Sequence, residues 1–156
     1  MYNAGNGYKR LIQAESRSGV FLDNVAAAVI LNESEQILLQ LRDQKEGIRS
    51  AGKWSLPGGF RKLSETSIQA VKREVFEETN LVLTNPFYFA NLIDIFEGSR
   101  YVSIDFYFEK IYFPYKLEVN EGQDLKFFNL NDVVYLNTNK HIELICLYAF
   151  ELLKTD

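Results

Sequence analysis

One stretch of the chain places a glycine-rich turn directly ahead of a helix that carries three carboxylates on one side. The turn is Pro57-Gly58-Gly59, and the carboxylates are Glu74, Glu77 and Glu78. Their spacing of i, i+3 and i+4 brings them onto a single helical face within one turn. Like charges at this spacing weaken a helix by roughly a few tenths of a kcal/mol per pair. The arrangement therefore indicates a role other than helix stability.

Oxygen-rich clusters of this kind suit hard divalent cations. Mg²⁺ usually keeps several waters and shares its remaining coordination with substrate phosphates, and Mn²⁺ accepts similar ligands. The sequence therefore predicts Mg²⁺ as the cofactor, with Mn²⁺ as an alternative. Solvent-facing charge is the ordinary role of helical carboxylates, and it is the register with the residues around them that argues against that role here.

At these positions the chain resembles the Nudix hydrolase family, whose signature is G-x5-E-x7-R-E-U-x-E-E-x-G-U, where U is a bulky aliphatic residue. The matching residues are Gly59, Glu65, Arg73, Glu74, Val75, Glu77, Glu78 and Leu81. The last glycine of the signature is replaced by Asn80. Asn is the next most tolerant residue for left-handed backbone after Gly, so we expect a slight effect on helix capping and hardly any on the chemistry.

The resemblance implies hydrolysis of a nucleoside diphosphate linked to another group. It also implies roles for the matching residues. The implied metal ligands are the backbone carbonyl of Gly59 and the side chains of Glu74, Glu77 and Glu78. Arg73 would steer Glu74 through a charge-assisted hydrogen bond. Glu65 would support the site or assist the activation of water.

Two further groups of side chains are candidates for the same site. Many members of the family recruit a carboxylate from a loop well after the helix. Glu121 is our candidate for it, and Glu118 and Asp124 remain alternatives. Three cationic residues ahead of the glycine turn could hold phosphates, although a solvated surface is the usual place for such side chains: Arg42, Arg49 and Lys53.

Hydrophobic periodicity predicts an α+β domain with a curved mixed sheet flanked by helices. The family resemblance implies the sharper form, an α/β/α sandwich. Strands are expected over residues 25–31, 36–42, 87–96, 101–113, 116–119 and 125–130. Helices are expected over residues 65–79 and 140–154, the first with Ser64 as its N-cap. Residues 1–22 could form an arm, a strand or a helix.

The bulk properties fit one domain over residues 1–156. Hydrophobic residues make up 47% and charged residues 24% of the chain, which is ordinary for a globular protein. The net charge of −4 gives no excess of positive charge for binding a nucleic-acid backbone, and it disfavours a role in messenger-RNA decapping. An anionic substrate must therefore be attracted by local cations and metal. No nucleic-acid or membrane partner is expected.

A reducing compartment is expected because the single cysteine, Cys146, excludes an internal disulfide. The start of the chain lacks the apolar segment of a signal peptide, so a cytoplasmic protein is predicted. Cys146 is expected in the core, Trp54 in packing beneath a loop, and His141 at the surface or in a helix cap. The apolar last helix could bury itself within the monomer or pair in a homodimer.

The leading functional hypothesis is metal-dependent hydrolysis of a nucleoside triphosphate or a nucleotide sugar. An alternative is a catalytically silent nucleotide-binding regulatory module on the same fold, but such relatives generally lose catalytic carboxylates and none is lost here. An isomerase acting on isoprenoid diphosphates would need a catalytic cysteine near the site. Cys146 lies far along the chain, in a predicted helix, and disfavours that reading.

Overall fold

A computed structural model of the protein describes residues 23–96 and 100–154. Residues 1–22, for which an arm, a strand or a helix is expected, lie outside the described residues. In chain order the elements are β1 Asp23–Leu31, β2 Ile37–Leu41, β3 Trp54–Ser55, β4 Gly58–Phe60, α2 Ser67–Thr79, β5 Phe87–Phe96, β6 Arg100–Lys110, β7 Asp124–Phe128, α3 Leu130–Val133 and α4 Lys140–Leu153.

The described strands form one mixed sheet with the order β3-β2-β1-β6-β5. β1 and β6 run parallel along their whole shared length, from Asp23 opposite Val102 to Leu31 opposite Lys110. The other pairs are antiparallel. β7 pairs with β2, and β4 pairs with the first half of β1. This last pairing brings the glycine turn to the middle of the sheet.

β1 is apolar on both faces because both faces of the sheet are covered. Val29 and Leu31 belong to one hydrophobic core, whereas Ala28 and Ile30 belong to the other. Successive side chains of a strand point to opposite faces, so a strand buried on both sides reads as a continuous apolar run. This accounts for the run at residues 25–31 in the sequence.

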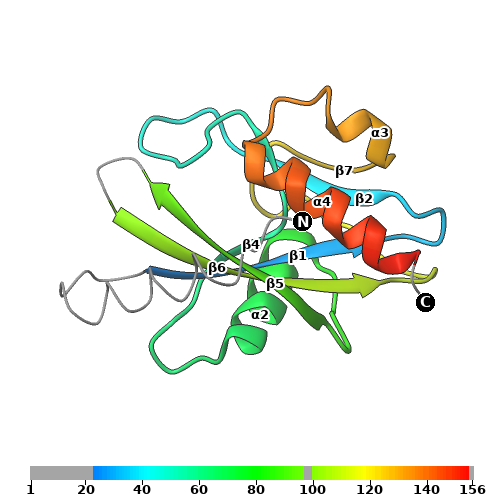
Figure 1. Ribbon diagram of the computed structural model, residues 1–156, viewed down its shortest axis with the longest axis horizontal. Helices are drawn as coiled ribbons and strands as arrows, with labels where there is room; N and C mark the ends of the chain where they lie inside the picture. Colours follow the sequence, from blue (N-terminus) through cyan, green and yellow to red (C-terminus); the bar gives the residue numbers. More distant parts are fainter. Residues whose placement is uncertain (1–22, 97–99, 155–156) are drawn as a thin grey trace.

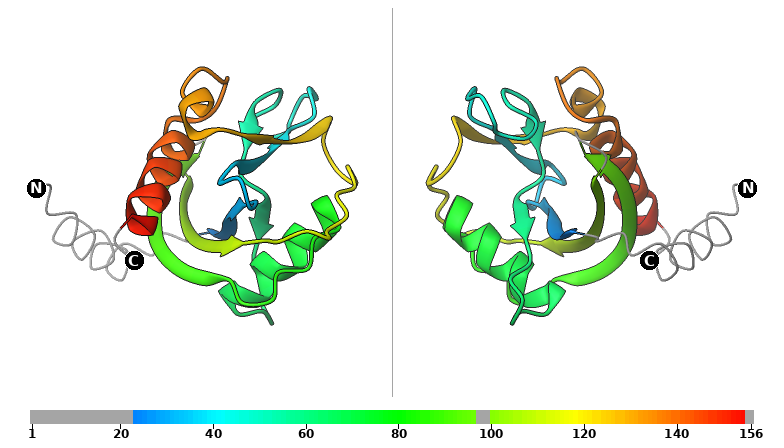
Figure 2. Two further views of the ribbon diagram at one scale, coloured as in Figure 1. Left: turned by 90° about the vertical axis from the view of Figure 1, so that its right-hand side faces the viewer. Right: turned by 90° about the vertical axis from the view of Figure 1, so that its left-hand side faces the viewer.

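Each core is covered by one helix. α4 packs Ile145 and Cys146 into the first core, and α2 packs Val71 and Val75 into the second. Figure 1 shows α4 crossing the sheet, and the turned views of Figure 2 show α2 and α4 on different sides of the curved strands. The predicted α+β fold with a curved mixed sheet flanked by helices is confirmed. Cys146 is fully buried, as expected.

The predicted start of the first helix is wrong by two residues. Thr66, not Ser64, is the N-cap of α2: its hydroxyl accepts a hydrogen bond from the Gln69 N–H at 3.3 Å, and the Gln69 side chain accepts one from the Thr66 N–H at 2.9 Å. This reciprocal pair is a capping box. Glu65 therefore precedes the helix. Asn80 ends it in the left-handed conformation, with φ 64°, as its replacement of glycine suggested.

The strand predicted over residues 116–119 is also wrong. This segment gives its hydrogen bonds to the end of α2 rather than to a neighbouring strand: the Glu118 N–H donates to the Thr79 carbonyl at 3.0 Å, and the Asn120 N–H donates to the Glu78 carbonyl at 3.2 Å. The last carbonyls of a helix have no partner within the helix, so they attract such donors. The strand predicted over residues 101–113 ends earlier, at Lys110.

None of the helices within residues 23–96 and 100–154 has the length and apolar character needed to cross a membrane.

The capping geometry predicts that Thr66→Ala destabilises the protein by about 1 kcal/mol, because one N-cap hydrogen bond of α2 is lost. Ser64→Ala is the matched control, since Ser64 is exposed and lies outside the cap. It should change the free energy of unfolding by less than about 0.5 kcal/mol. Urea unfolding measures both. An equal loss in the two variants would contradict the assignment of the cap.

Candidate active site

The glycine turn enters the sheet through a contact that only glycine permits. β4 lies antiparallel to β1, with Gly58 opposite Ala27. Gly58 has φ 150°, and a Cβ on it would lie 2.2 Å from the carbonyl oxygen of Ala26. A side chain at this position would push β4 away from β1. This close contact with β1 fixes the position of the Gly58 and Gly59 backbone next to α2.

Glu78 is a buried carboxylate held by this turn. It is 2% exposed, and its Oε2 accepts a hydrogen bond from the Gly58 N–H at 2.9 Å. Burial, with a smaller contribution from the nearby carboxylates of Glu121 and Glu74, raises the pKa of Glu78 to about 8, and the Gly58 N–H opposes the shift. Shifts of this kind, caused by burial together with neighbouring charges, are common at functional sites.

Glu74 lies directly against Gly59. A Cβ on Gly59 would lie 2.5 Å from the Glu74 carboxylate, so the missing side chain leaves the space that this carboxylate occupies. Glu74 and Glu78 are one turn apart on α2 and both line the same pocket as Gly58 and Gly59. The sequence-predicted carboxylates at these two positions are therefore brought together with the backbone of the turn.

Arg73 connects the remaining members of the signature. Its guanidinium contacts Glu65 at 2.5 Å, Glu74 at 2.7 Å and Glu77 at 3.0 Å, and it donates to the Phe60 carbonyl at 3.1 Å. Hydrogen bonds from Arg73 and from the Lys62 N–H lower the pKa of Glu65 to about 2, whereas burial opposes the shift. Glu65 is thus an anion that holds Arg73, and Arg73 in turn orients Glu74.

Glu77 differs from the other two helical carboxylates. Its side chain is 52% exposed, and it does not line the pocket that holds Glu74 and Glu78. Its described partner is Arg73. The geometry places it at the outer edge of the charged cluster.

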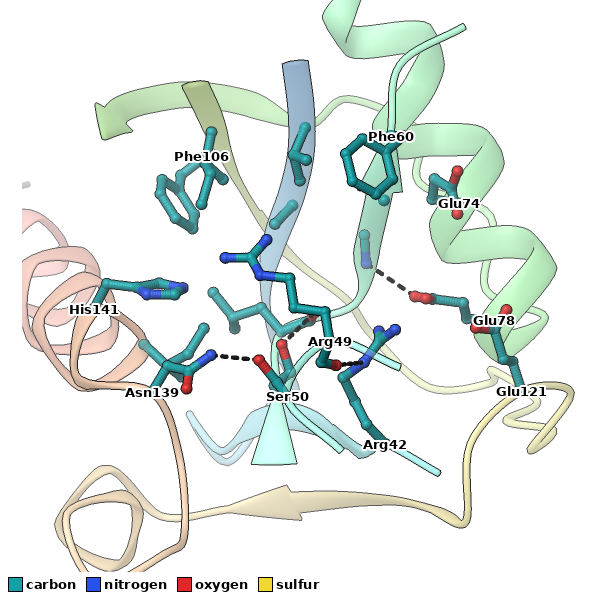
Figure 3. A pocket seen from close by; sticks show the side chains of 18 residues that line it. Arg42, Arg49, Ser50, Phe60, Glu74, Glu78, Phe106, Glu121, Asn139 and His141 are labelled. Carbon is teal, nitrogen blue, oxygen red and sulfur yellow. Dashed lines mark hydrogen bonds between the residues drawn. The ribbon is translucent and has the colours of Figure 1, made fainter. Parts of the chain in front are cut away.

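The pocket of about 250 Å³ has two chemically different ends. Figure 3 shows Glu74, Glu78 and Glu121 on one side, His141 and Asn139 on the other, and Arg42 and Arg49 between them. The rings of Phe60 and Phe106 and the apolar side chains of β1 complete the lining. An anion entering this pocket would meet guanidinium groups next to carboxylates, which is the arrangement expected where cations bridge the carboxylates and phosphates.

The three cationic candidates are placed differently. Arg42 and Arg49 line the pocket, and the Arg42 Nε donates to the Arg49 carbonyl at 3.0 Å. Burial lowers the pKa of Arg49 to about 10, with Asp94 opposing this and Arg42 adding to it. Lys53 lies outside this pocket, in a neighbouring hollow, where its Nζ donates to Asn139 Oδ1 at 3.0 Å.

Of the three downstream carboxylates, Glu121 lines the pocket in the part of the chain that the structure describes. It lies beside Glu78 because the preceding residues hydrogen-bond to the end of α2 and because its carbonyl accepts from the buried Gln40 Nε2 at 2.9 Å. Glu118 pairs with Lys116 outside the pocket, and the Asp124 side chain accepts from the Leu125 N–H. The geometry favours Glu121.

Sequence reasoning missed the far side of the pocket. His141 was expected at the surface or in a helix cap, but its side chain is only 17% exposed and lines the pocket beside Ser50 and Asn139. The Trp54 N–H donates to the Asn137 carbonyl at 2.9 Å. This hydrogen bond holds the segment before α4 close to the pocket. Trp54 was expected to pack beneath a loop; its ring packs edge-on against Phe128 of β7, with ring centroids 4.7 Å apart. Periodicity carries no signal for this long-range contact.

The comparison with known families is decisive. The model described as the NUDIX domain matches residues 22–148, most of the chain. The chain belongs to the Nudix family. Its membership and its fold together make it a Nudix pyrophosphohydrolase. Among curated proteins, no match to the sequence is found.

Solved structures share the fold at low sequence identity. The MutT protein from Methanosarcina mazei is 22% identical with a TM-score of 0.73, over 88% of this chain and 98% of that one. An Ap4A hydrolase from C. elegans, solved as a binary complex, is 19% identical with a TM-score of 0.74, over 86% and 100%. The Nudix domain of Shewanella oneidensis NrtR, complexed with ADP ribose, is 19% identical with a TM-score of 0.74, over 94% and 97%.

The carboxylate side chains of the pocket have the oxygen donors that a hard divalent cation prefers. They would have to move closer to one another to bind such a cation. Among the described residues, no three acidic, histidine or cysteine side chains lie close enough to hold a metal ion as they stand. One Glu74 oxygen is engaged by Arg73, and one Glu78 oxygen by Gly58. The donor set is nonetheless all oxygen, and the absent Cβ of Gly59 lets the Glu74 carboxylate lie directly against the Gly59 backbone.

The raised pKa of Glu78 predicts a stability penalty in metal-free protein. Between pH 4.5 and about 8 the folded state keeps the proton that the unfolded state has released, so stability falls as pH rises through this window. Glu78→Gln removes this charge and keeps an acceptor for the Gly58 N–H. At pH 8 with EDTA it should be more stable than wild type by on the order of a few kcal/mol, and nearly equal at pH 5.

Glu77→Gln is the control, since Glu77 is half exposed and exposed ion pairs contribute little. It should stay within about 1 kcal/mol of wild type at both pH values. Thermal or urea unfolding at each pH is the measurement. A Glu78→Gln variant that is less stable than wild type at pH 8 would contradict the burial argument.

Proposed function

We propose that this protein hydrolyses the diphosphate linkage of a nucleoside diphosphate derivative, a nucleoside triphosphate or a nucleotide sugar, in a reaction that depends on Mg²⁺. The observation that carries the proposal is the composition of a single pocket. Glu74, Glu78 and Glu121 line it together with Arg42 and Arg49, whose side chains lie between these carboxylates and His141. A diphosphate needs both kinds of group, because its charge must be neutralised while one phosphorus is attacked by water.

The proposed ligands of the cation are Glu74, Glu78, Glu121 and the carbonyl of Gly59, with Glu77 joining from the outer edge. When bound, Mg²⁺ would neutralise charge on the phosphoryl oxygens and acidify a water near the diphosphate. Mn²⁺ has the same ligand preference and should substitute for it.

The other residues act through position and charge. Arg73 keeps Glu74 against Gly59, and Glu65 holds Arg73 in place. Arg42 and Arg49 would hold the phosphates through charge-assisted hydrogen bonds. Metal-free Glu78 keeps its proton below about pH 8, so a bound cation would have to release that proton before the Glu78 carboxylate could act as a ligand or accept a proton from water.

The choice of substrate class rests on the pocket and on the solved relatives. A pocket of about 250 Å³ suits one nucleoside-sized group, with the phosphates at its acidic end. The names of the similar structures include an Ap4A hydrolase and a domain complexed with ADP ribose, so both compounds belong in the test. The screening panel is therefore dGTP, 8-oxo-dGTP, ADP-ribose, UDP-glucose and Ap4A, each with Mg²⁺ or Mn²⁺.

Glu78→Gln should lower kcat on the best panel substrate by roughly 1000-fold, because it removes both a proposed cation ligand and a proton acceptor. Circular dichroism should show an unchanged fold. Phosphate release, with a coupling pyrophosphatase or phosphatase, measures the rate. Activity within a few-fold of wild type would remove the proposed mechanism. Hydrolysis of no panel compound by wild type, combined with binding of one of them, would favour the silent nucleotide-binding module.

Glu121→Gln should lower kcat or metal affinity by roughly 10- to 100-fold, as is usual when a supporting ligand of a metal site is lost. Glu118→Gln is the matched control, because Glu118 lies three residues away and pairs with Lys116 outside the pocket. Its rate should stay within about twofold of wild type. The same phosphate-release assay, run as a Mg²⁺ titration, compares them. Equal losses would show that Glu121 has no special position.

A further inference from the structure

Asp94 joins two residues of the pocket that come from distant parts of the chain. Its Oδ2 lies 3.3 Å from the His141 Nδ1 and 3.7 Å from an Arg49 terminal nitrogen. Arg49 belongs to the loop between β2 and β3, Asp94 to β5, and His141 to the first turn of α4. One carboxylate on the sheet thus touches a loop and a helix at the same time.

The two residues that Asp94 touches face the pocket together. Figure 3 shows the ring of His141 and the guanidinium of Arg49 directed toward one another, across from the acidic end. Asp94 itself lines a neighbouring hollow of about 910 Å³, together with Lys53 and Lys140. Four residues line both spaces and form the wall between them: Arg49, Ser50, Asn139 and His141.

The contact with Asp94 determines what each partner offers to a ligand. Burial lowers the pKa of His141, with Asp94 opposing and Arg49 adding to the shift, so the ring is neutral at pH 7. A carboxylate facing Nδ1 keeps the proton on that nitrogen, which leaves Nε2 as an acceptor. Arg49 contributes donors only. The wall therefore presents a hydrogen-bond acceptor, His141 Nε2, beside the hydrogen-bond donors of the Arg49 guanidinium.

Folding stability does not account for this arrangement. The Asp94 side chain is 41% exposed and that of Arg49 is 36% exposed. Ion pairs at such exposure contribute little to stability. Arg42 also lies close enough to repel the positive charge of Arg49. A counter-charge at Asp94 is therefore best explained as a means of keeping the Arg49 guanidinium beside Arg42 and within the pocket.

We propose that Asp94 is a positioning residue that sets Arg49 and His141 to recognise the part of the substrate remote from the cleaved diphosphate. This inference rests on the proposed function of the same pocket. The group recognised must offer both a hydrogen-bond acceptor and a donor, as a nucleobase edge or a sugar with neighbouring hydroxyls does. Asp94 itself stays outside the reacting atoms, so its loss affects binding rather than the chemical step.

The test is steady-state kinetics on the panel substrate that wild type hydrolyses fastest. Asp94→Asn should raise KM about tenfold, the effect of one misplaced charged hydrogen bond, and leave kcat within about twofold. Asp94→Glu keeps the charge and should recover most of the lost affinity. Asp43→Asn is the matched control: Asp43 lies on the same loop as Arg49, and its ion pair with Lys45 also spans 3.7 Å. It should leave KM unchanged.

A double-mutant cycle tests whether Asp94 acts through Arg49. In an Arg49→Ala background, Asp94→Asn should change KM much less than it does in wild type, because the group that it positions is already gone. Unfolding midpoints of Asp94→Asn and Asp43→Asn should agree. Equal KM values for these two variants, or fully additive effects with Arg49→Ala, would overturn the proposal.

A failure of the proposed function can be told apart from a failure of this inference. If wild type hydrolyses no panel compound, the proposed function fails, and calorimetric binding of ADP then decides the inference. Affinity for ADP that is about tenfold weaker in Asp94→Asn than in Asp43→Asn supports it. Equal affinities, or no binding of ADP to wild type, overturn it.

Discussion

The hydrogen bond between the Gly58 N–H and the Glu78 carboxylate is the contact on which the rest of the site depends. Gly58 can reach α2 only because it has no side chain to clash with β1, and Glu78 can be buried only because the turn supplies a donor. The sheet, the turn and the helix thus meet at one acidic group. Its pKa, raised to about 8 by burial, reflects the energetic cost of that position.

Two other constraints extend this contact into a working pocket. Arg73 and Glu65 hold Glu74 in the space left by Gly59, so that the carboxylates on α2 keep a fixed relation to the turn. The chain after β6 then hydrogen-bonds to the last carbonyls of α2, which brings Glu121 beside Glu78. Like charges are therefore gathered by backbone contacts, an arrangement that costs stability unless a cation binds there.

The sequence was sufficient for the parts of the site that lie within one short segment. Spacing alone placed Glu74 and Glu78 on one face of a helix behind the glycine turn, because helical geometry is local. The N-cap prediction at Ser64 was wrong although the sequence carries the signal, because Thr66 and Gln69 have the spacing of a capping box and Ser64 has no such partner. His141 and Asp94 were missed because β5 and α4 meet only in the folded chain. The segment at residues 116–119 has the sequence pattern of a strand, but its backbone hydrogen-bonds to the end of α2 instead.

The most direct test of the account is to locate the cation by diffraction from a crystal soaked in Mn²⁺, using its anomalous signal, with a non-hydrolysable nucleotide diphosphate present. The account predicts a peak within coordinating distance of Glu74, Glu78 and the Gly59 carbonyl, with Glu78 kept on the Gly58 N–H or turned to the ion. A peak elsewhere on the protein, or none at these side chains while the nucleotide occupies the pocket, would contradict it.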